Sequence, residues 1–122
     1  MSAGRVDWFY RRKGCRDCER AQALISEHGL EIKTVVDVDK VRFSGSRLIA
    51  LAREAERLLS AAEGGVTELD LRRSPPSDEE LQRLLMGAEG GLRVPAVRIG
   101  RTLLVGFDEA MYRTALARGG GA

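Results

Sequence analysis

The first forty residues pass from a strand pattern to a helix pattern and back. Residues 6–10, "VDWFY", are a short β-branched and aromatic run typical of a strand. From Arg16 to His28 apolar residues recur at helical spacing, and Gly29 supplies a helix stop. Residues 30–38 alternate apolar and polar positions, which predicts a second strand. This order predicts a βαβ unit whose two strands are parallel.

The middle of the chain carries a longer helical pattern. Between 48 and 62, apolar residues recur at helical spacing and stop before Gly64-Gly65, which predicts an amphipathic helix. Residues 66–71, "VTELDL", alternate and predict a short extra strand. The Pro75-Pro76 pair then breaks the chain before the next element.

Two further helices begin with capping signals. Ser77 and Glu80 have the spacing of a capping box, so we expect a helix over about 78–86. Asp108 has the position of an N-cap before a last helix over about 109–118. Each cap places an oxygen near backbone amides that would otherwise lack a partner.

The segment between these helices predicts a β-hairpin. The runs "RVPAVRIG" and "RTLLVG" are short and apolar, and Gly100-Arg101 joins them. The whole order predicts an α/β fold, with a sheet layered by helices. With 122 residues, one domain over 1–118 is expected, followed by a disordered tail, "GGGA", over 119–122.

Charge and composition indicate the class of protein more than its partners. Hydrophobic residues make up 43% and charged residues 31%, as in a soluble globular protein. The net charge is +2, from 20 basic and 18 acidic residues, which does not favour nucleic-acid binding. No apolar run approaches the roughly 20 residues that cross a bilayer, and "MSAGRVDWFY" lacks a signal-peptide pattern. We therefore expect a cytoplasmic protein without nucleic-acid or membrane partners.

Both cysteines of the chain lie in "RRKGCRDCERAQAL", three residues apart. In a cytoplasmic protein, a C-x-x-C pair between a strand and a helix is typical of a redox dithiol. Half of a zinc site and two inert helix thiols are the alternatives. Zinc normally needs four ligands, and His28 is the chain's one histidine, so no metal is expected.

Cys15 is the candidate nucleophile and Cys18 the candidate resolving cysteine. Cys15 lies at the expected helix start, where free amides and the helix dipole favour a thiolate. Arg12 and Lys13 add positive charge, and Gly14 allows a partner's backbone to approach closely. Attack by the resolving cysteine on a mixed disulfide at the first would release the partner.

Pro95 is the second unusual feature. It lies between β-forming residues in "LRVPAVRIG", where proline removes a ladder donor. A cis Val94–Pro95 bond would explain it, and so would a trans proline on an edge strand.

These two segments resemble the thioredoxin-fold superfamily, in its glutaredoxin and arsenate-reductase (ArsC)-like branch. The resemblance rests on "VDWFYRRKGCRDCERAQALISEHG" and "RVPAVRIGRTLLVGFDEAMY". It implies a mixed four-stranded sheet with an expanded helical middle, a cis-proline before the third strand, and Cys15 as the redox residue. The chain is most similar to small members of the arsenate-reductase family, some of which carry selenocysteine. In arsenate reductases an arginine directly precedes the proline, whereas here Val94 does and Arg93 comes one residue earlier.

The resemblance also implies partners and contacts. By it, Arg12 or Lys13 would meet a glutathione carboxylate, the Val94 backbone would pair with the peptide, and Asp108 would meet its amine. It implies no bound cofactor, glutathione as a candidate reductant, and a monomer that exchanges disulfides with small or protein thiols of the glutathione or thioredoxin system.

Three functions are therefore open. The first is a thiol–disulfide oxidoreductase that uses Cys15 and Cys18. The second is an oxyanion reductase acting on arsenate, which needs an anion pocket of arginines near Cys15. The candidates are Arg12, close to Cys15 in the sequence, and Arg93, Arg98 and Arg101, close to Pro95. The third is a redox-switched transcription partner similar to Spx, which would bind RNA polymerase through helices in residues 46–86.

Overall fold

The computed structural model describes residues 5–118, and its centre is a mixed six-stranded sheet. The strands lie in the order β4 (Val35–Asp37), β2 (Trp8–Arg11), β7 (Ala96–Ile99), β8 (Thr102–Val105), β5 (Arg57–Ala62) and β6 (Gly65–Asp70). A separate parallel pair joins β1 (Arg5–Val6) to β3 (Glu31–Ile32). The helices are α1 (Arg16–Glu27), α2 (Gly45–Arg53), α3 (Asp78–Leu85) and α4 (Glu109–Ala117).

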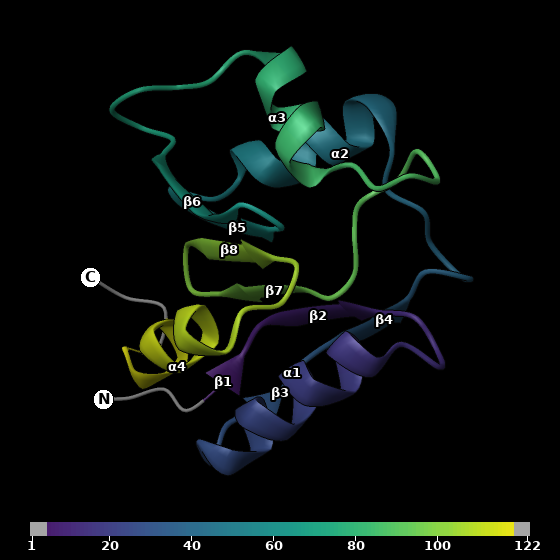
Figure 1. Cartoon of the computed structure of the whole chain (residues 1–122), viewed down its shortest axis with the longest axis vertical. Coiled ribbons are helices and arrows are strands. Elements are labelled where there is room, and N and C mark those ends of the chain that lie inside the picture. Colours follow the sequence, from purple (N-terminus) through teal and green to yellow (C-terminus); the bar gives the residue numbers. More distant parts are fainter. Residues whose placement is uncertain (1–4, 119–122) are drawn as a thin grey trace.

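Helices cover both faces of the sheet. Figure 1 shows α1 and α4 on one side of it and α2 and α3 on the other. The strand alternation divides the core accordingly: Phe9 belongs to the cluster under α1 and α4, and Tyr10 to the cluster under α2 and α3. Val94 is partly buried against both clusters, so the segment before β7 lies between the two layers.

The elements with strong local signals are confirmed. β2 and β4 are parallel, and β7 and β8 form the expected antiparallel hairpin. Ser77 Oγ accepts a hydrogen bond from the Glu80 amide at 3.1 Å, and the Asp108 carboxylate accepts one from the Met111 amide at 2.9 Å. Both caps thus start their helices where the sequence predicts.

The long helix predicted over 48–62 is wrong. α2 ends at Arg53, and residues 57–62 form β5 instead. β5 pairs with β6 along its whole length and with β8 over residues 57–60, so most of its backbone is paired on both sides within the sheet. Packing of Leu58 on one face and Ala61 on the other overrides the helical spacing.

The central sheet has six strands and not the four expected, because residues 57–62 form a strand and not the end of a helix. The β5–β6 hairpin extends the sheet beyond β8, and the segment Gly64-Gly65 lies at its turn rather than after a helix. The predicted extra strand over 66–71 is present as β6. The middle of the chain therefore contains two helices and a hairpin, and the predicted tail over 119–122 lies outside the described residues.

Candidate functional site

Cys15 lies between the end of β2 and the start of α1. The chain turns through Gly14, whose φ of 76° is a conformation that L side chains rarely adopt. Cys15 follows in an extended conformation as the N-cap residue of α1. Its Sγ accepts a hydrogen bond from the Cys18 amide at 3.1 Å, so sulfur takes the place that a capping oxygen has in other helices.

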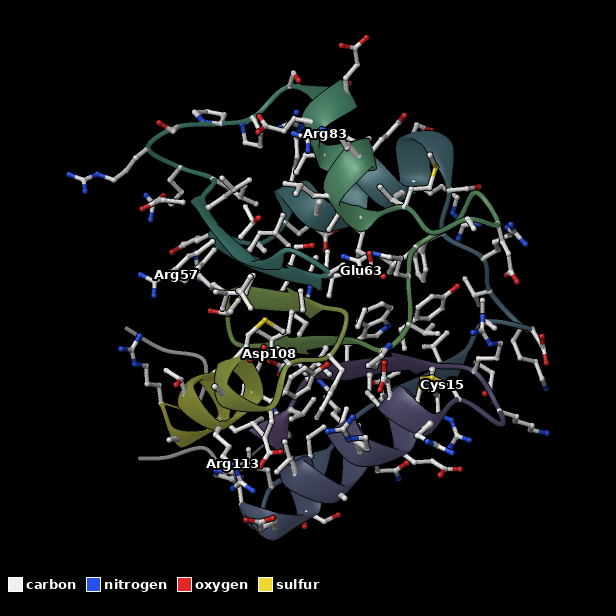
Figure 2. The ribbon with its side chains drawn as sticks, in the orientation of Figure 1. Cys15, Arg57, Glu63, Arg83, Asp108 and Arg113 are labelled. Atoms are coloured by element: carbon white, nitrogen blue, oxygen red, sulfur yellow. A yellow bond between two sulfur atoms is a disulfide. The ribbon has the colours of Figure 1, made fainter. Side chains whose placement is uncertain are left out.

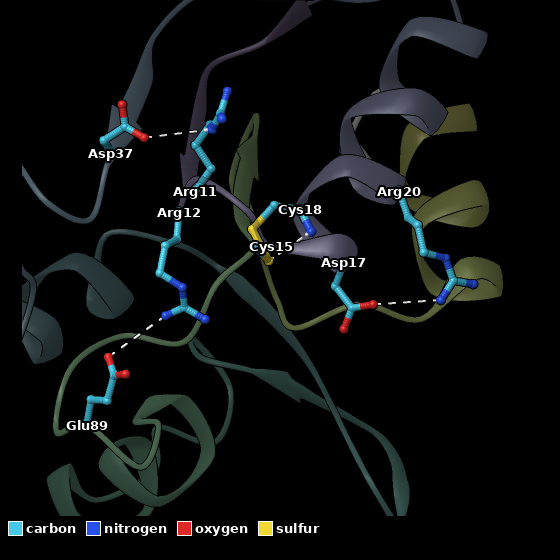
Figure 3. Close-up of a disulfide and its surroundings, with 8 residues drawn as sticks. All are labelled: Arg11, Arg12, Cys15, Asp17, Cys18, Arg20, Asp37 and Glu89. Atoms are coloured by element: carbon cyan, nitrogen blue, oxygen red, sulfur yellow. Dashed lines mark hydrogen bonds and ion pairs between the residues drawn. A yellow bond between two sulfur atoms is a disulfide. The ribbon is translucent and has the colours of Figure 1, made fainter.

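A disulfide joins Cys15 to Cys18 across a Cα–Cα distance of 5.2 Å (Figure 3). The two sulfurs differ in access, because Cys15 is partly exposed and Cys18 is only 3% exposed within the core under α1 and α4. An incoming thiol or disulfide can therefore approach the first cysteine, whereas the second is reached from Cys15.

Exposed basic side chains surround the first cysteine. Arg12, Lys13 and Arg16 are all exposed, and Arg12 lies 3.8 Å from the carboxylate of Glu89. Asp17, between the cysteines, lies 3.7 Å from Arg20 in a pair along the helix (Figure 3). These cations and the dipole of α1 favour a negative charge on Cys15 Sγ, whereas Asp17 and Glu19 in the first turn oppose it.

Val94 and Pro95 lie beside this turn. The Val94–Pro95 peptide bond is cis, as one of the two alternatives predicts. Because Tyr10 pairs with Ala96 between β2 and β7, Pro95 comes opposite the end of β2, just before the turn that carries Cys15. The Pro95 carbonyl accepts a hydrogen bond from the Gly106 amide at 2.8 Å, which fixes the segment to the end of β8.

A groove of about 290 Å³ borders the same turn. Arg12 and Val94 line it together with Arg42, Glu89 and Leu92. The Arg42 guanidinium donates to the Glu89 carbonyl, so a glycine-rich loop over 87–91 is tied to the segment before α2. The sequence analysis did not predict Arg42 and Glu89 as residues of this groove. The glycines around Glu89 indicate a loop there, and they were the one sequence feature that pointed to this segment.

Asp108 occupies a different part of the molecule. Besides capping α4, it lines a cavity of about 310 Å³ with Leu59, Met111 and Ala115, beside the β5–β6 hairpin. Figure 2 shows Asp108 at the start of α4 and Cys15 apart from it, at the start of α1. Contact between Asp108 and a glutathione amine stays a prediction.

The four arginines considered for an oxyanion pocket do not gather around the disulfide as a group, because three of them bind other partners. Arg93 donates to the Ser60 hydroxyl and to the Ala61 and Leu84 carbonyls. Arg98 pairs with Glu54 at 3.2 Å, and Arg101 pairs with Glu56. Of the arginines named for that pocket, Arg12 and Arg93 line the groove by the turn of Cys15, where Glu89 supplies an opposing carboxylate, and Arg98 and Arg101 do not line it.

Residues 5–118 contain no cluster of three or more His, Cys, Asp or Glu side chains placed to hold a metal ion. His28 ends α1, where its Nδ1 lies 2.9 Å from the Leu24 carbonyl. None of the described helices is long and apolar enough to cross a bilayer. No protein-family model matches the chain, and no curated protein is significantly similar to it.

Proposed function

We propose that the protein is a thiol–disulfide oxidoreductase in which Cys15 and Cys18 alternate between dithiol and disulfide. The observation that carries the proposal is the unequal exposure of a disulfide-bonded C-x-x-C pair at a helix N-terminus. A structural role explains this poorly, because a disulfide closing so short a loop restricts the unfolded chain little.

The proposed fold is a variant of the thioredoxin type. Strands β4, β2, β7 and β8 are adjacent and have the parallel and antiparallel pairings that the βαβ…ββα resemblance implies. The β5–β6 hairpin is then an addition at the β8 edge. The position of the disulfide after β2, and of a cis-proline before β7, supports this assignment.

In the reductive direction the cysteines act in sequence. The Cys15 thiolate attacks one sulfur of a substrate disulfide, forming a mixed disulfide and expelling the first substrate thiolate. The Cys18 thiolate then attacks Cys15 Sγ, forming the intramolecular disulfide and expelling the second thiolate. Both leaving thiolates take up protons from water. The two electrons come from the dithiol, so an external thiol reductant must restore it.

The surroundings of Cys15 favour its thiolate. The Cys18 amide already donates to Cys15 Sγ, and this bond strengthens when sulfur carries a charge. The dipole of α1 and the exposed side chains of Arg12, Lys13 and Arg16 act in the same direction. Cys15 is therefore the nucleophile of the proposed mechanism.

The groove beside Cys15 supplies the proposed binding surface for the substrate or reductant. Val94 offers an apolar contact, and Arg12 and Arg42 offer cations to a carboxylate. Glutathione and the thioredoxin system are the proposed reductants, and both deliver electrons as thiols. The proposal requires no bound metal or cofactor.

Trapping with Cys18→Ser tests the mechanism. The reduced variant, mixed with glutathione disulfide, is expected to retain one glutathionyl group on Cys15 by mass spectrometry, while Cys15→Ser retains none. The wild-type protein is expected to reduce hydroxyethyl disulfide with glutathione as reductant, and Cys15→Ser to lose this activity. Full activity of Cys15→Ser, or no adduct on Cys18→Ser, would show the mechanism to be wrong.

A further inference from the structure

A second groove lies between α3 and the β5–β6 hairpin. Its volume is about 500 Å³, within the range of small-molecule sites. Ser60 and Thr67, which pair directly across β5 and β6, line it. Arg83, Leu84, Met86 and Arg93 line its opposite side. Neither cysteine belongs to it.

The charged residues that line this groove are both arginines. Arg93 is partly buried, and its guanidinium donates to the Ser60 hydroxyl at 2.7 Å and to the Ala61 and Leu84 carbonyls at 2.7 and 2.8 Å. These three acceptors are neutral, and no carboxylate within residues 5–118 forms an ion pair with Arg93. Burial accordingly lowers the pKa of Arg93. The half-buried cation thus has hydrogen bonds but no opposite charge.

Arg83 supplies a second cation on the α3 side of the groove, and Figure 2 shows it on that helix. Its side chain is 70% exposed and lies 3.6 Å from Glu80, one turn earlier on the same helix. Glu63 lies at the hairpin turn and does not line the groove. The groove walls are therefore positive, with acidic groups only outside them.

The rest of the lining is suited to an organic ligand. Leu84 and Met86 form an apolar wall, and Met86 is 39% exposed although it is a large hydrophobic residue. The three bonds of Arg93 use three of the five N–H groups that a guanidinium offers. An oxyanion at this position would supply the missing opposite charge.

We propose that this groove binds a small organic anion. Its oxyanion group, a phosphate or a carboxylate, meets Arg83 and Arg93, and its apolar body contacts Leu84 and Met86. The site contains neither cysteine, and Arg93 lines both this groove and the groove beside Cys15.

Titration of the full chain with three ligands at low ionic strength tests this site. Benzoate and benzamide have the same shape and differ in charge, and phenyl phosphate distinguishes a phosphate from a carboxylate ligand. By two-dimensional NMR, benzoate or phenyl phosphate is expected to shift the amides of Gly65, Thr67 and Leu84 in a saturable way, while benzamide does not. The anion that binds more tightly shows whether the site prefers a phosphate or a carboxylate group.

Two arginine variants test whether the charge of Arg83 contributes to anion binding. Arg83→Gln is expected to weaken anion binding about two- to fivefold, as for an exposed cation. Arg73→Gln removes the same charge from an exposed arginine outside the groove and is expected to change nothing. The site would be refuted by equal binding of benzamide and benzoate, by equal weakening in both variants, or by no saturable shift with either anion.

Discussion

Gly106 is the position where one added methyl group is expected to cost most. Its φ is 82°, and a Cβ placed there would lie 2.6 Å from the Ala61 carbonyl oxygen and 3.0 Å from the guanidinium of Arg93. The left-handed conformation costs an L residue about 1–2 kcal/mol, and forcing an atom into a packed site costs about 1–3 kcal/mol more. Gly106→Ala should therefore lower the free energy of unfolding by about 2–5 kcal/mol.

Gly29→Ala is the matched control for this prediction. Gly29 has a similar φ of 71°, but no heavy atom lies within 4 Å of the position where its Cβ would be. It should lose only the conformational part, about 1–2 kcal/mol. Guanidinium denaturation followed by circular dichroism measures both values in the oxidised protein. Equal losses in the two variants would refute the packing argument.

Gly106→Ala is also expected to affect the disulfide site. The Gly106 amide donates to the Pro95 carbonyl, and the segment it holds borders the groove beside Cys15. Gly106→Ala should thus slow the reduction of hydroxyethyl disulfide under conditions where the variant stays folded. The control variant should keep the wild-type rate.

Two further substitutions test individual side chains. Glu89→Gln removes the carboxylate beside Arg12 and leaves that cation free for an anionic substrate, so the KM for dithiodipropionate should fall about two- to fivefold relative to the KM for neutral hydroxyethyl disulfide. Glu63→Gln is the charge-matched control. An equal change of KM in both variants would contradict the placement of Arg12 in the substrate groove. Tyr112→Phe removes a fully buried hydroxyl that has no hydrogen-bond partner among residues 5–118, and it should stabilise the fold by about 1 kcal/mol in thermal denaturation. Burial raises the pKa of Tyr112, so its phenol ionises more easily in the unfolded chain and wild-type stability should fall above about pH 10. The variant should lose less stability there, and an unchanged alkaline profile would count against this account.

Features set by neighbouring residues were predictable from the sequence. The N-caps at Ser77 and Asp108 need only an oxygen near the next few amides, and both helices begin as expected. The placement of Cys15 at the start of α1 follows equally from the strand before it and the helix pattern after it. The cis bond at Val94–Pro95 was one of two alternatives that the residues left open, and the family resemblance favoured it.

Features set by distant pairing were not predictable in the same way. The run "RLLSAA" fits a helix and a strand about equally well by spacing, and its partners β6 and β8 decide the outcome. The groove beside Cys15 shows the same limit, because Arg42 and Glu89 join Arg12 only after three separate loops meet. The Gly64-Gly65 pair between two short runs was a hairpin signal that the helical spacing concealed.

The hairpin that the sequence pattern obscured has a direct connection to the disulfide site. Arg93 binds the end of β5 through Ser60 and Ala61 and the end of α3 through the Leu84 carbonyl. The next residue, Val94, lines the groove beside Cys15, and its neighbour Pro95 is tied to Gly106. A change at the ends of β5 or α3 can therefore move the segment next to the nucleophile without touching either cysteine. An anion bound at Arg93 would act on that same segment, so the second groove and the disulfide site are expected to influence each other through Arg93.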